Sequence, residues 1–166
     1  MVARGAWARA GVVLVGVVAL DQVAKVLVIG ALAPGERRAL LPFVDLVNTR
    51  NTGVAFGLLE GREVIVGAVV AVAVAALVAY FARHEATPGL WLPVGMLLGG
   101  ALGNVIDRIR LGAVVDFLKL PAWPAFNVAD SAITVGIVAL FVVVERHDRR
   151  RAREEKAAAG GAAGPA

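Results

Sequence analysis

The chain has 166 residues, 59% of them hydrophobic, and a mean hydropathy of +0.78. A soluble domain of this size needs far less apolar material for its core, so the composition excludes an ordinary soluble protein and indicates an integral membrane protein. The formal charge of +4 could indicate nucleic-acid binding. The basic residues, however, gather at the ends of apolar segments, so we expect no nucleic-acid partner.

Four apolar stretches are long enough to cross a bilayer, because about 20 predominantly apolar residues span its hydrocarbon layer as a helix. The first is interrupted by Asp21 and Lys25, and the third is rich in glycine, which permits close helix packing in membranes. We predict an α-helical integral membrane protein with four transmembrane helices, at residues 10–32, 64–81, 90–106 and 126–144.

The distribution of basic residues predicts the orientation of these spans. Arginines precede the first span, lie between the second and third, and follow the fourth. These places fall on one side of a four-span topology, which the positive-inside rule makes cytoplasmic, with both termini inside. The first span resembles a secretory signal, but no small-x-small site closes its apolar pattern, so we expect it to be retained.

The polar segments on the external side predict a small β-sheet between spans one and two, within residues 36–62. Residues 40–47 have the β-branched and apolar content of a strand, residues 48–53 have turn chemistry, and residues 54–59 are typical of a returning strand. Such a sheet would lie on the outer leaflet.

The second external segment and the tail complete the domain organisation. Residues 107–125 predict a compact loop with an extended piece at 113–118. Residues 1–150 then form one membrane domain, and residues 151–166 form a disordered cytoplasmic tail.

Polar residues in and beside the spans fall at a similar depth. At a rise of about 1.5 Å per residue, Asp21 and Asp130 lie roughly 18 and 22 Å from the cytoplasmic ends of their helices. Asn104 and Asp107 lie roughly 21 and 26 Å from the start of the third span. All four approach the external interface of a layer about 30 Å thick, so we predict that they share one site.

Two clusters support this prediction, each with a structural alternative. Asp21 and Lys25 are spaced i,i+4 and can pair, either to orient a site or, as we favour, to make an intramembrane charge tolerable, with Lys25 extending toward water. Asn104 and Asp107 share a helix face, and Arg108 is a cation at the interface. This second cluster either pins a helix end or binds a substrate or lipid.

Asp116 and Asp130 are the candidates for catalysis. Amide hydrolysis needs a nucleophile and a proton donor. The chain has no cysteine, its only serine is Ser131, and both histidines, His84 and His147, lie at the cytoplasmic ends of spans. A Ser-His-Asp arrangement is therefore implausible, and no zinc-ligand spacing occurs.

Two carboxylates that share a proton can do this work, because one stays ionised and activates water while the other donates to the scissile carbonyl. Each acid also has a simpler interpretation, with Asp130 as a helix N-cap and Asp116 as a surface acid. The absence of other suppliers favours the pair.

Four sequence motifs resemble those of the lipoprotein signal peptidases, the aspartic type II signal peptidases of bacterial inner membranes. They are DQVAK at residues 21–25, NTRNTGVAFG at 48–57, GGALGNVIDR at 99–108 with GAVVDF at 112–117, and FNVADS at 126–131. The resemblance runs from residue 21 to about 135 in the family's order.

The resemblance implies a bacterial enzyme that cuts diacylglyceryl-modified prolipoproteins on the N-terminal side of the lipidated cysteine. It implies that Asp116 and Asp130 are the catalytic pair, at the external face, that the sheet forms a cradle over the site, and that the acyl chains stay in lipid between helices. Substrate-binding or supporting roles fall to Asn51, Gly53, Asn104, Asp107, Arg108, Asn127, Ala129, Asp21 and Lys25. Asp107 belongs there because it ends a helix beside Arg108. We expect a monomer that needs no metal or organic cofactor and meets only its substrate and membrane lipid.

Two other classes of function compete with this interpretation. A non-enzymatic binding protein would use the acids as polar contacts between helices, so neutralising them would reduce stability before function. An ion-coupled transporter would place Asp21, Asp107 and Asp130 near the bilayer midplane, within related halves of the chain. The acids fall near one face and no repeat is visible, which argues against transport.

Overall fold

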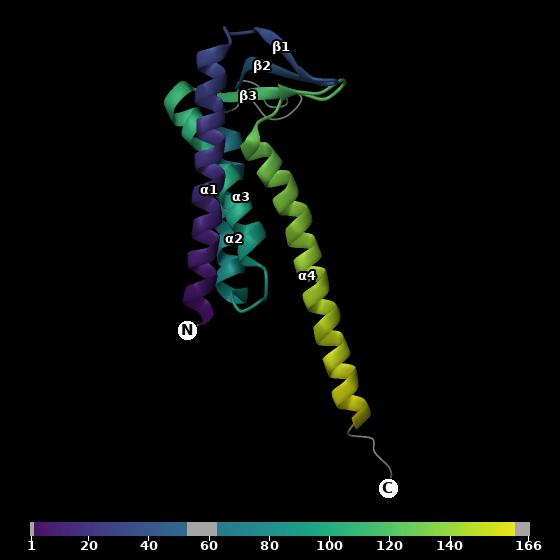
Figure 1. The fold of residues 1–166 in the computed structure, drawn as a ribbon. Coiled ribbons are helices and arrows are strands. Elements are labelled where there is room, and N and C mark those ends of the chain that lie inside the picture. Colours follow the sequence, from purple (N-terminus) through teal and green to yellow (C-terminus); the bar gives the residue numbers. More distant parts are fainter. Residues whose placement is uncertain (1, 53–62, 162–166) are drawn as a thin grey trace.

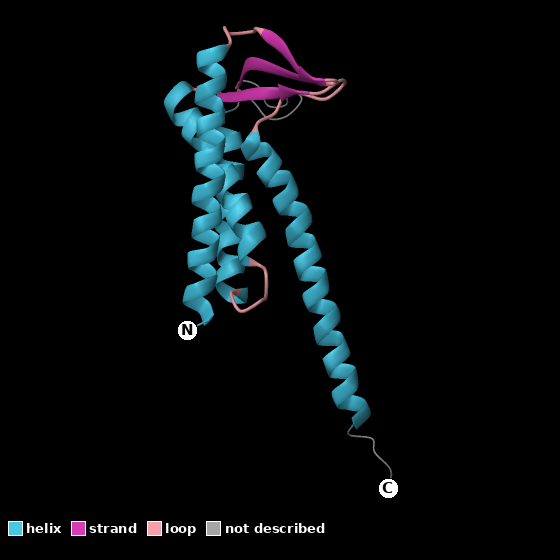
Figure 2. Ribbon diagram, viewed as in Figure 1, coloured by secondary structure: helices cyan, strands magenta, loops and turns pink. Residues whose placement is uncertain are grey.

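The computed structural model describes residues 2–52 and 63–161. Its four helices are α1 (Val2–Ala31), α2 (Glu63–His84), α3 (Trp91–Leu111) and α4 (Val128–Gly161). Each of the four is long and apolar enough to cross a membrane, which confirms the predicted spans. The first turn of α1 and the last turns of α4 lie at one end of the molecule, and the sheet lies across the other end (Figures 1 and 2).

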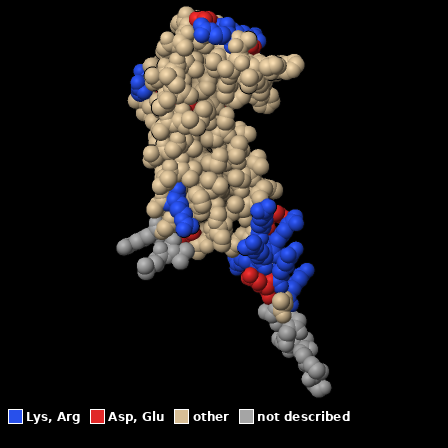
Figure 3. All heavy atoms as spheres, in the orientation of Figure 1, with Lys and Arg blue, Asp and Glu red and all other residues tan. Residues whose placement is uncertain are grey.

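Charged residues gather at the two ends of the bundle. Figure 3 shows a broad band of uncharged residues between them, as expected of a surface that faces lipid. Many of the large apolar side chains within the spans are exposed, among them Val12, Leu27, Val72 and Phe141. In a bilayer these side chains would contact acyl chains, so their exposure is consistent with a membrane protein.

The sheet has three antiparallel strands in the order β1 (Arg37–Leu41), β2 (Val44–Asn51) and β3 (Val114–Lys119). β3 confirms the extended piece predicted at 113–118, and it joins the sheet from the loop between α3 and α4. The sheet therefore connects the two segments that the sequence predicts to be external.

Two predictions about this sheet need correction. The strand predicted at 40–47 is divided by a turn, since Pro42 cannot donate a ladder hydrogen bond and Phe43 has a positive φ of 67°. The turn predicted at 48–53 is wrong for residues 48–51, because they belong to β2. The returning strand predicted at 54–59 lies outside the described residues.

The chain beyond residue 150 also differs from the prediction, because α4 continues to Gly161. Its last turns are rich in alanine, glutamate, lysine and arginine, all strong helix formers. An exposed i,i+4 ion pair between Arg149 and Glu145 adds to this local preference. The expected disorder is therefore wrong for residues 151–161.

Glycines let α3 pack closely between α1 and α4. A Cβ atom on Gly95 would lie 2.6 Å from the carbonyl oxygen of Ala10 in α1. A Cβ on Gly100 would lie 2.5 Å from the carbonyl oxygen of Ala129 in α4. Backbones this close leave no room for a side chain, so the glycines have the packing role expected of small residues in membrane bundles.

We expect Gly100→Ala to destabilise the bundle by about 1–3 kcal/mol, the usual cost of overpacking. Thermal unfolding in detergent measures the effect. Gly16→Ala in α1 is the matched control, because a Cβ there meets nothing within 4 Å. Equal melting temperatures for the two variants would contradict the packing role of Gly100.

Candidate active site

Asp116 and Asp130 come from different elements and meet around one side chain, Asn127. Asp116 lies in β3, and Asp130 lies in the first turn of α4. The Nδ2 of Asn127 donates to Oδ1 of Asp116 at 2.8 Å, and its Oδ1 accepts from the backbone N–H of Asp130 at 2.9 Å. Asn127 is fully buried. A single rigid amide therefore holds the two acids in one place.

The start of α4 fixes the position of Asp130. Asn127 precedes the helix, and its side chain accepts the backbone N–H of Asp130 three residues later. The Oδ2 of Asp130 accepts the backbone N–H of Asn127 at 3.3 Å. This reciprocal arrangement is a capping box. Asn127 is thus the N-cap, so the interpretation of Asp130 as the capping residue is wrong.

Asp116 is 2% exposed and surrounded by neutral donors. The Nδ2 of Asn51, in β2, donates to its Oδ2 at 3.0 Å. The pKa of Asp116 is raised to about 6, chiefly by burial and also by the negative charge of Asp130, which together outweigh the hydrogen bonds from Asn51 and Asn127 that lower it. Asp116 is therefore able to gain and lose a proton near neutral pH.

A buried cation lies next to the two acids. Lys25 is 2% exposed, and its Nζ lies 2.7 Å from Oδ2 of Asp21 and 2.8 Å from Oδ2 of Asp107. It also donates to Oδ1 of Asn104 at 3.2 Å. The predicted pair between Asp21 and Lys25 is present. The expectation that Lys25 extends toward water is wrong, because its buried ammonium contacts Asp21, Asp107 and Asn104 within the bundle.

Asn104 connects this cation to the acid pair. Its Oδ1 accepts from Lys25 and, at 3.1 Å, from Nδ2 of Asn127. Its Nδ2 donates to Oδ1 of Asp130 at 2.8 Å. The four polar residues expected at one depth, Asp21, Asn104, Asp107 and Asp130, therefore belong to one continuous network.

The supporting acids also fix the backbone on either side of the pair. Oδ1 of Asp21 accepts the backbone N–H of Ala129 at 2.9 Å, directly before Asp130. Oδ2 of Asp107 accepts the backbone N–H of Val115 at 3.0 Å, directly before Asp116. Asp107 and Asp21 thus each bind the backbone immediately before one acid of the pair.

Sequence analysis missed two residues of this network, Gln22 and Thr49. The Nε2 of Gln22 donates to Oδ1 of Asp107 at 3.0 Å and to the carbonyl of Gly103 at 3.2 Å. The Oγ1 of Thr49 donates to the backbone carbonyl of Asp116 at 3.0 Å. Both residues lie within the motifs at 21–25 and 48–57, so their place in a motif could have indicated that they belong to the site. Gly53 lies outside the described residues.

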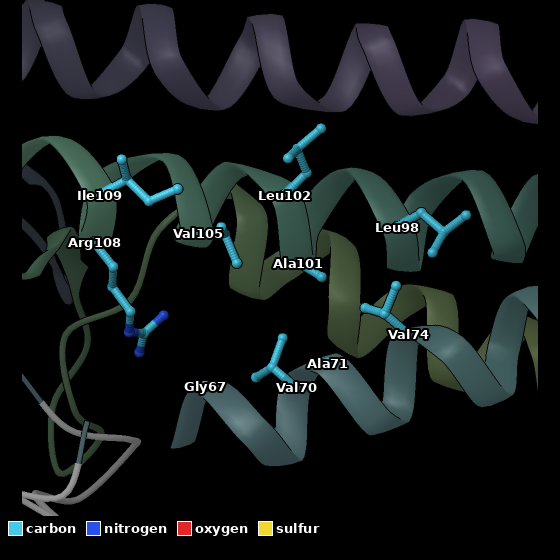
Figure 4. Close-up of a pocket in the computed structure, with 10 residues that line it drawn as sticks. All are labelled: Gly67, Val70, Ala71, Val74, Leu98, Ala101, Leu102, Val105, Arg108 and Ile109. Carbon is cyan, nitrogen blue, oxygen red and sulfur yellow. The ribbon is translucent and has the colours of Figure 1, made fainter. Parts of the chain in front are cut away.

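Arg108 lies at one end of an apolar cavity of about 600 Å³ between α2 and α3. Figure 4 shows its guanidinium turned toward the space between the two helices, with Val70 and Val74 of α2 facing Ala101 and Val105 of α3. A cation at one end of an apolar cavity suits a molecule with a polar group and a hydrocarbon chain.

Other candidate nucleophiles and ligands lie apart from this geometry. The hydroxyl of Ser131 donates to the carbonyl of Asn127 at 3.0 Å, a bond within the first turn of α4. His84 ends α2 at the far end of the bundle. Within the described residues, no group of three or more His, Cys, Asp or Glu side chains could hold a metal ion.

We expect Lys25→Met to destabilise the protein by about 3–5 kcal/mol, because it leaves Asp21 and Asp107 buried without their cation. Thermal unfolding in detergent measures the loss. Lys119→Met is the control, since that lysine lies in β3 and donates only to the carbonyl of Trp123 among the contacts described for it. A Lys25→Met variant as stable as the control would contradict the structural role of the cation.

Comparisons with known proteins identify the family. The family model for signal peptidase (SPase) II matches residues 13–145. Lipoprotein signal peptidases from Moorella thermoacetica and Halothermothrix orenii are 44% and 35% identical, over 75% and 83% of this chain and 84% and 96% of theirs. A bacterial membrane enzyme solved by the in meso method at 2.3 Å superposes with a TM-score of 0.75 at 31% identity, over 82% of this chain and 87% of that one. The chain therefore belongs to the signal peptidase II family.

Proposed function

We propose that this protein removes the signal peptide from diacylglyceryl-modified prolipoproteins, cutting on the N-terminal side of the lipidated cysteine, with Asp116 and Asp130 as general acid and base. The family supports the removal of signal peptides from prolipoproteins. One observation carries the mechanism: two acids from separate elements share Asn127, and one of them has a pKa of about 6.

The reaction needs one proton on the pair. The ionised carboxylate takes a proton from a water molecule, and the oxygen of that water attacks the scissile carbonyl carbon. The other carboxyl donates its proton to the carbonyl oxygen, which gives a tetrahedral diol. Collapse of the diol breaks the C–N bond, and a proton passes from the pair to the leaving amine. Asp130 is half-buried, so water can reach the pair on its side.

The surrounding residues would position both the substrate and the pair. Asn51, Asn104 and Asn127 orient the two acids through their amides. Arg108 and the cavity between α2 and α3 suit the lipid portion of the substrate, with the guanidinium near the ester groups and the acyl chain between the helices. Gly53 completes the proposed set. No step requires a metal or an organic cofactor.

The membrane orientation follows from the same proposal. The sheet end, with Asp116 and Asp130, faces outward from the bacterial cytoplasmic membrane, and both termini face the cytoplasm. Arginines at the ends of α2 and α4 support this orientation. The sheet end carries arginines as well, but Arg37 and Arg38 pair there with Asp45 and Glu36. The enzyme would act as a monomer.

The catalytic domain would comprise residues 1–150, including the external sheet. The family match ends at residue 145, which supports a boundary soon afterwards. Residues 151–166 would lie outside the domain on the cytoplasmic side.

We expect Asp116→Asn and Asp130→Asn each to abolish cleavage while the protein still inserts and folds. Each variant keeps only one of the two carboxyls, so the pair can no longer share a proton between them. The assay mixes purified protein with a diacylglyceryl-modified precursor peptide and follows the mass of the products. Asp45→Asn is the control, since that acid lies in β2 and pairs with the exposed Arg37. Normal cleavage by either catalytic variant would refute the assignment.

Asp107→Asn tests the choice of acids. We expect it to keep more activity than the two catalytic variants, or to fail by unfolding, because Asp107 binds Lys25 and the backbone of β3. The same assay, run beside thermal unfolding, measures both outcomes. A well-folded Asp107→Asn variant with no activity at all would show that the wrong pair was chosen.

The pH dependence of cleavage follows from the pKa of Asp116. A carboxyl with a pKa of about 6 is protonated below that pH and ionised above it. The pair loses its shared proton as the pH rises, so we expect kcat/KM to fall above about pH 6, with an apparent pKa that belongs to the coupled pair.

Asn51→Leu should move this falling limb to higher pH, because the amide of Asn51 stabilises the ionised form of Asp116. Thr49→Val is the control, since Thr49 donates to the backbone carbonyl of Asp116 and not to its carboxylate. An unchanged limb in Asn51→Leu, or an equal shift in both variants, would contradict Asp116 as the titrating group.

A further inference from the structure

A second cavity lies at the opposite end of the bundle from the acid pair. Its volume is about 350 Å³, within the range of about 300–1,000 Å³ typical of small-molecule sites. The loop between α2 and α3 lines one side with Pro88 and Gly89. α4 lines the other side with Val143, Arg146, His147 and Arg150. None of these six residues is acidic.

The four residues of α4 form one face of the helix, at spacings i, i+3, i+4 and i+7. Two of the acids nearby in sequence, Glu145 and Glu85, have other partners. Glu145 accepts from Arg149 on a different face of α4. Glu85, in the facing loop, accepts the indole N–H of Trp7 in α1 at 2.8 Å. The cavity therefore gathers positive charge, and Figure 3 shows the blue cluster at this end of α4.

The wall opposite the arginines is anchored to the helix bundle. Gly89 has a φ of 83°, a left-handed conformation that favours glycine. A Cβ on Gly89 would lie 3.9 Å from Cγ2 of Val143, so loop and helix lie close together. The next residue, Leu90, is fully buried in the apolar core, where Val143 also packs. The cavity is thus a fixed feature of the fold.

The cavity lies at the boundary of the membrane. α3 begins at Trp91, next to Arg9, whose guanidinium lies 6.0 Å from the centre of the indole ring. Tryptophan and arginine are typical of the layer where lipid headgroups lie. Toward the sheet end, the same face of α4 continues into the apolar residues Ala139 and Leu140. The cavity therefore offers phosphate-binding groups on one side and a surface suited to hydrocarbon on the other.

We propose that this cavity binds the headgroup of an anionic phospholipid. The phosphate lies between Arg146 and Arg150, which can each offer several N–H donors. His147 adds a further ring N–H, since one nitrogen carries a proton in either neutral tautomer. The glycerol lies against Pro88 and Gly89, and the acyl chains follow the apolar turns of α4. Basic pockets between membrane helices at this level bind such headgroups. The site is separate from the peptidase chemistry.

The test measures lipid binding to the full chain, purified in an uncharged detergent, by native mass spectrometry. Phosphatidylglycerol is compared with phosphatidylcholine and with inorganic phosphate as a competitor. We expect phosphatidylglycerol to bind at least about tenfold more tightly than phosphatidylcholine. We also expect phosphate at equal concentration not to displace it. Equal binding of both lipids, or displacement by phosphate alone, would overturn the proposal.

A pair of variants separates the site from general attraction by the basic helix. Arg146→Gln with Arg150→Gln removes two charges from the cavity, and Arg149→Gln with Arg151→Gln removes two from other faces of the same helix. We expect the first pair to weaken phosphatidylglycerol binding at least about tenfold and the second to change it less than about threefold. Equal losses would show a diffuse attraction instead of a site. Melting temperatures and cleavage rates of both double variants show whether they fold. The comparison of phosphatidylglycerol with phosphatidylcholine uses the unmodified chain, so it tests the proposal even if a variant fails to fold.

Discussion

One buried ammonium group, that of Lys25, holds together the elements around the acid pair. A lysine in the interior of a membrane bundle is tolerated only if all its donors find acceptors. Here the acceptors are Asp21 of α1 and both Asp107 and Asn104 of α3. The two acids in turn accept backbone N–H groups at Ala129 and Val115. The charge of Lys25 thus fixes α4 and β3, the two elements that carry Asp130 and Asp116.

The same cation sets the direction of the amide of Asn104. The oxygen of that amide accepts from Lys25 and from Asn127, so its nitrogen must face Asp130. Reversing the amide would place the Nδ2 of Asn104, itself a donor, against the donors of Lys25 and Asn127. A positive charge that never contacts Asp130 therefore decides that Asp130 receives a hydrogen bond there. This is a positioning effect, carried by one rigid group from a buried ion pair to the proposed catalytic acid.

Features set by run length and spacing could be predicted from the sequence. The four spans follow from hydrophobicity, and the common depth of Asp21, Asn104 and Asp130 follows from helical rise. Features set by partners distant in sequence could not. Asn48 and Thr49 have turn-forming side chains, yet Asn48 donates to the carbonyl of Leu32, just after α1, and Thr49 donates to the carbonyl of Asp116 in β3. These tertiary hydrogen bonds replace the local ones that a turn would have used.

The surroundings of Asp107, compared with those of the pair, support Asp116 and Asp130 as the reacting groups. The two oxygens of Asp107 already accept from Gln22, the backbone of Val115 and the positive charge of Lys25, whereas those of Asp116 accept only from neutral side-chain amides in the contacts described. A water molecule or a scissile carbonyl would have to displace one of the donors to Asp107. Asp130 is half-buried, with single hydrogen bonds to each oxygen in the contacts described, so it keeps lone pairs for water. The acid that can meet water is therefore the one held by the capping box, and Asn127, which forms that box, also holds Asp116.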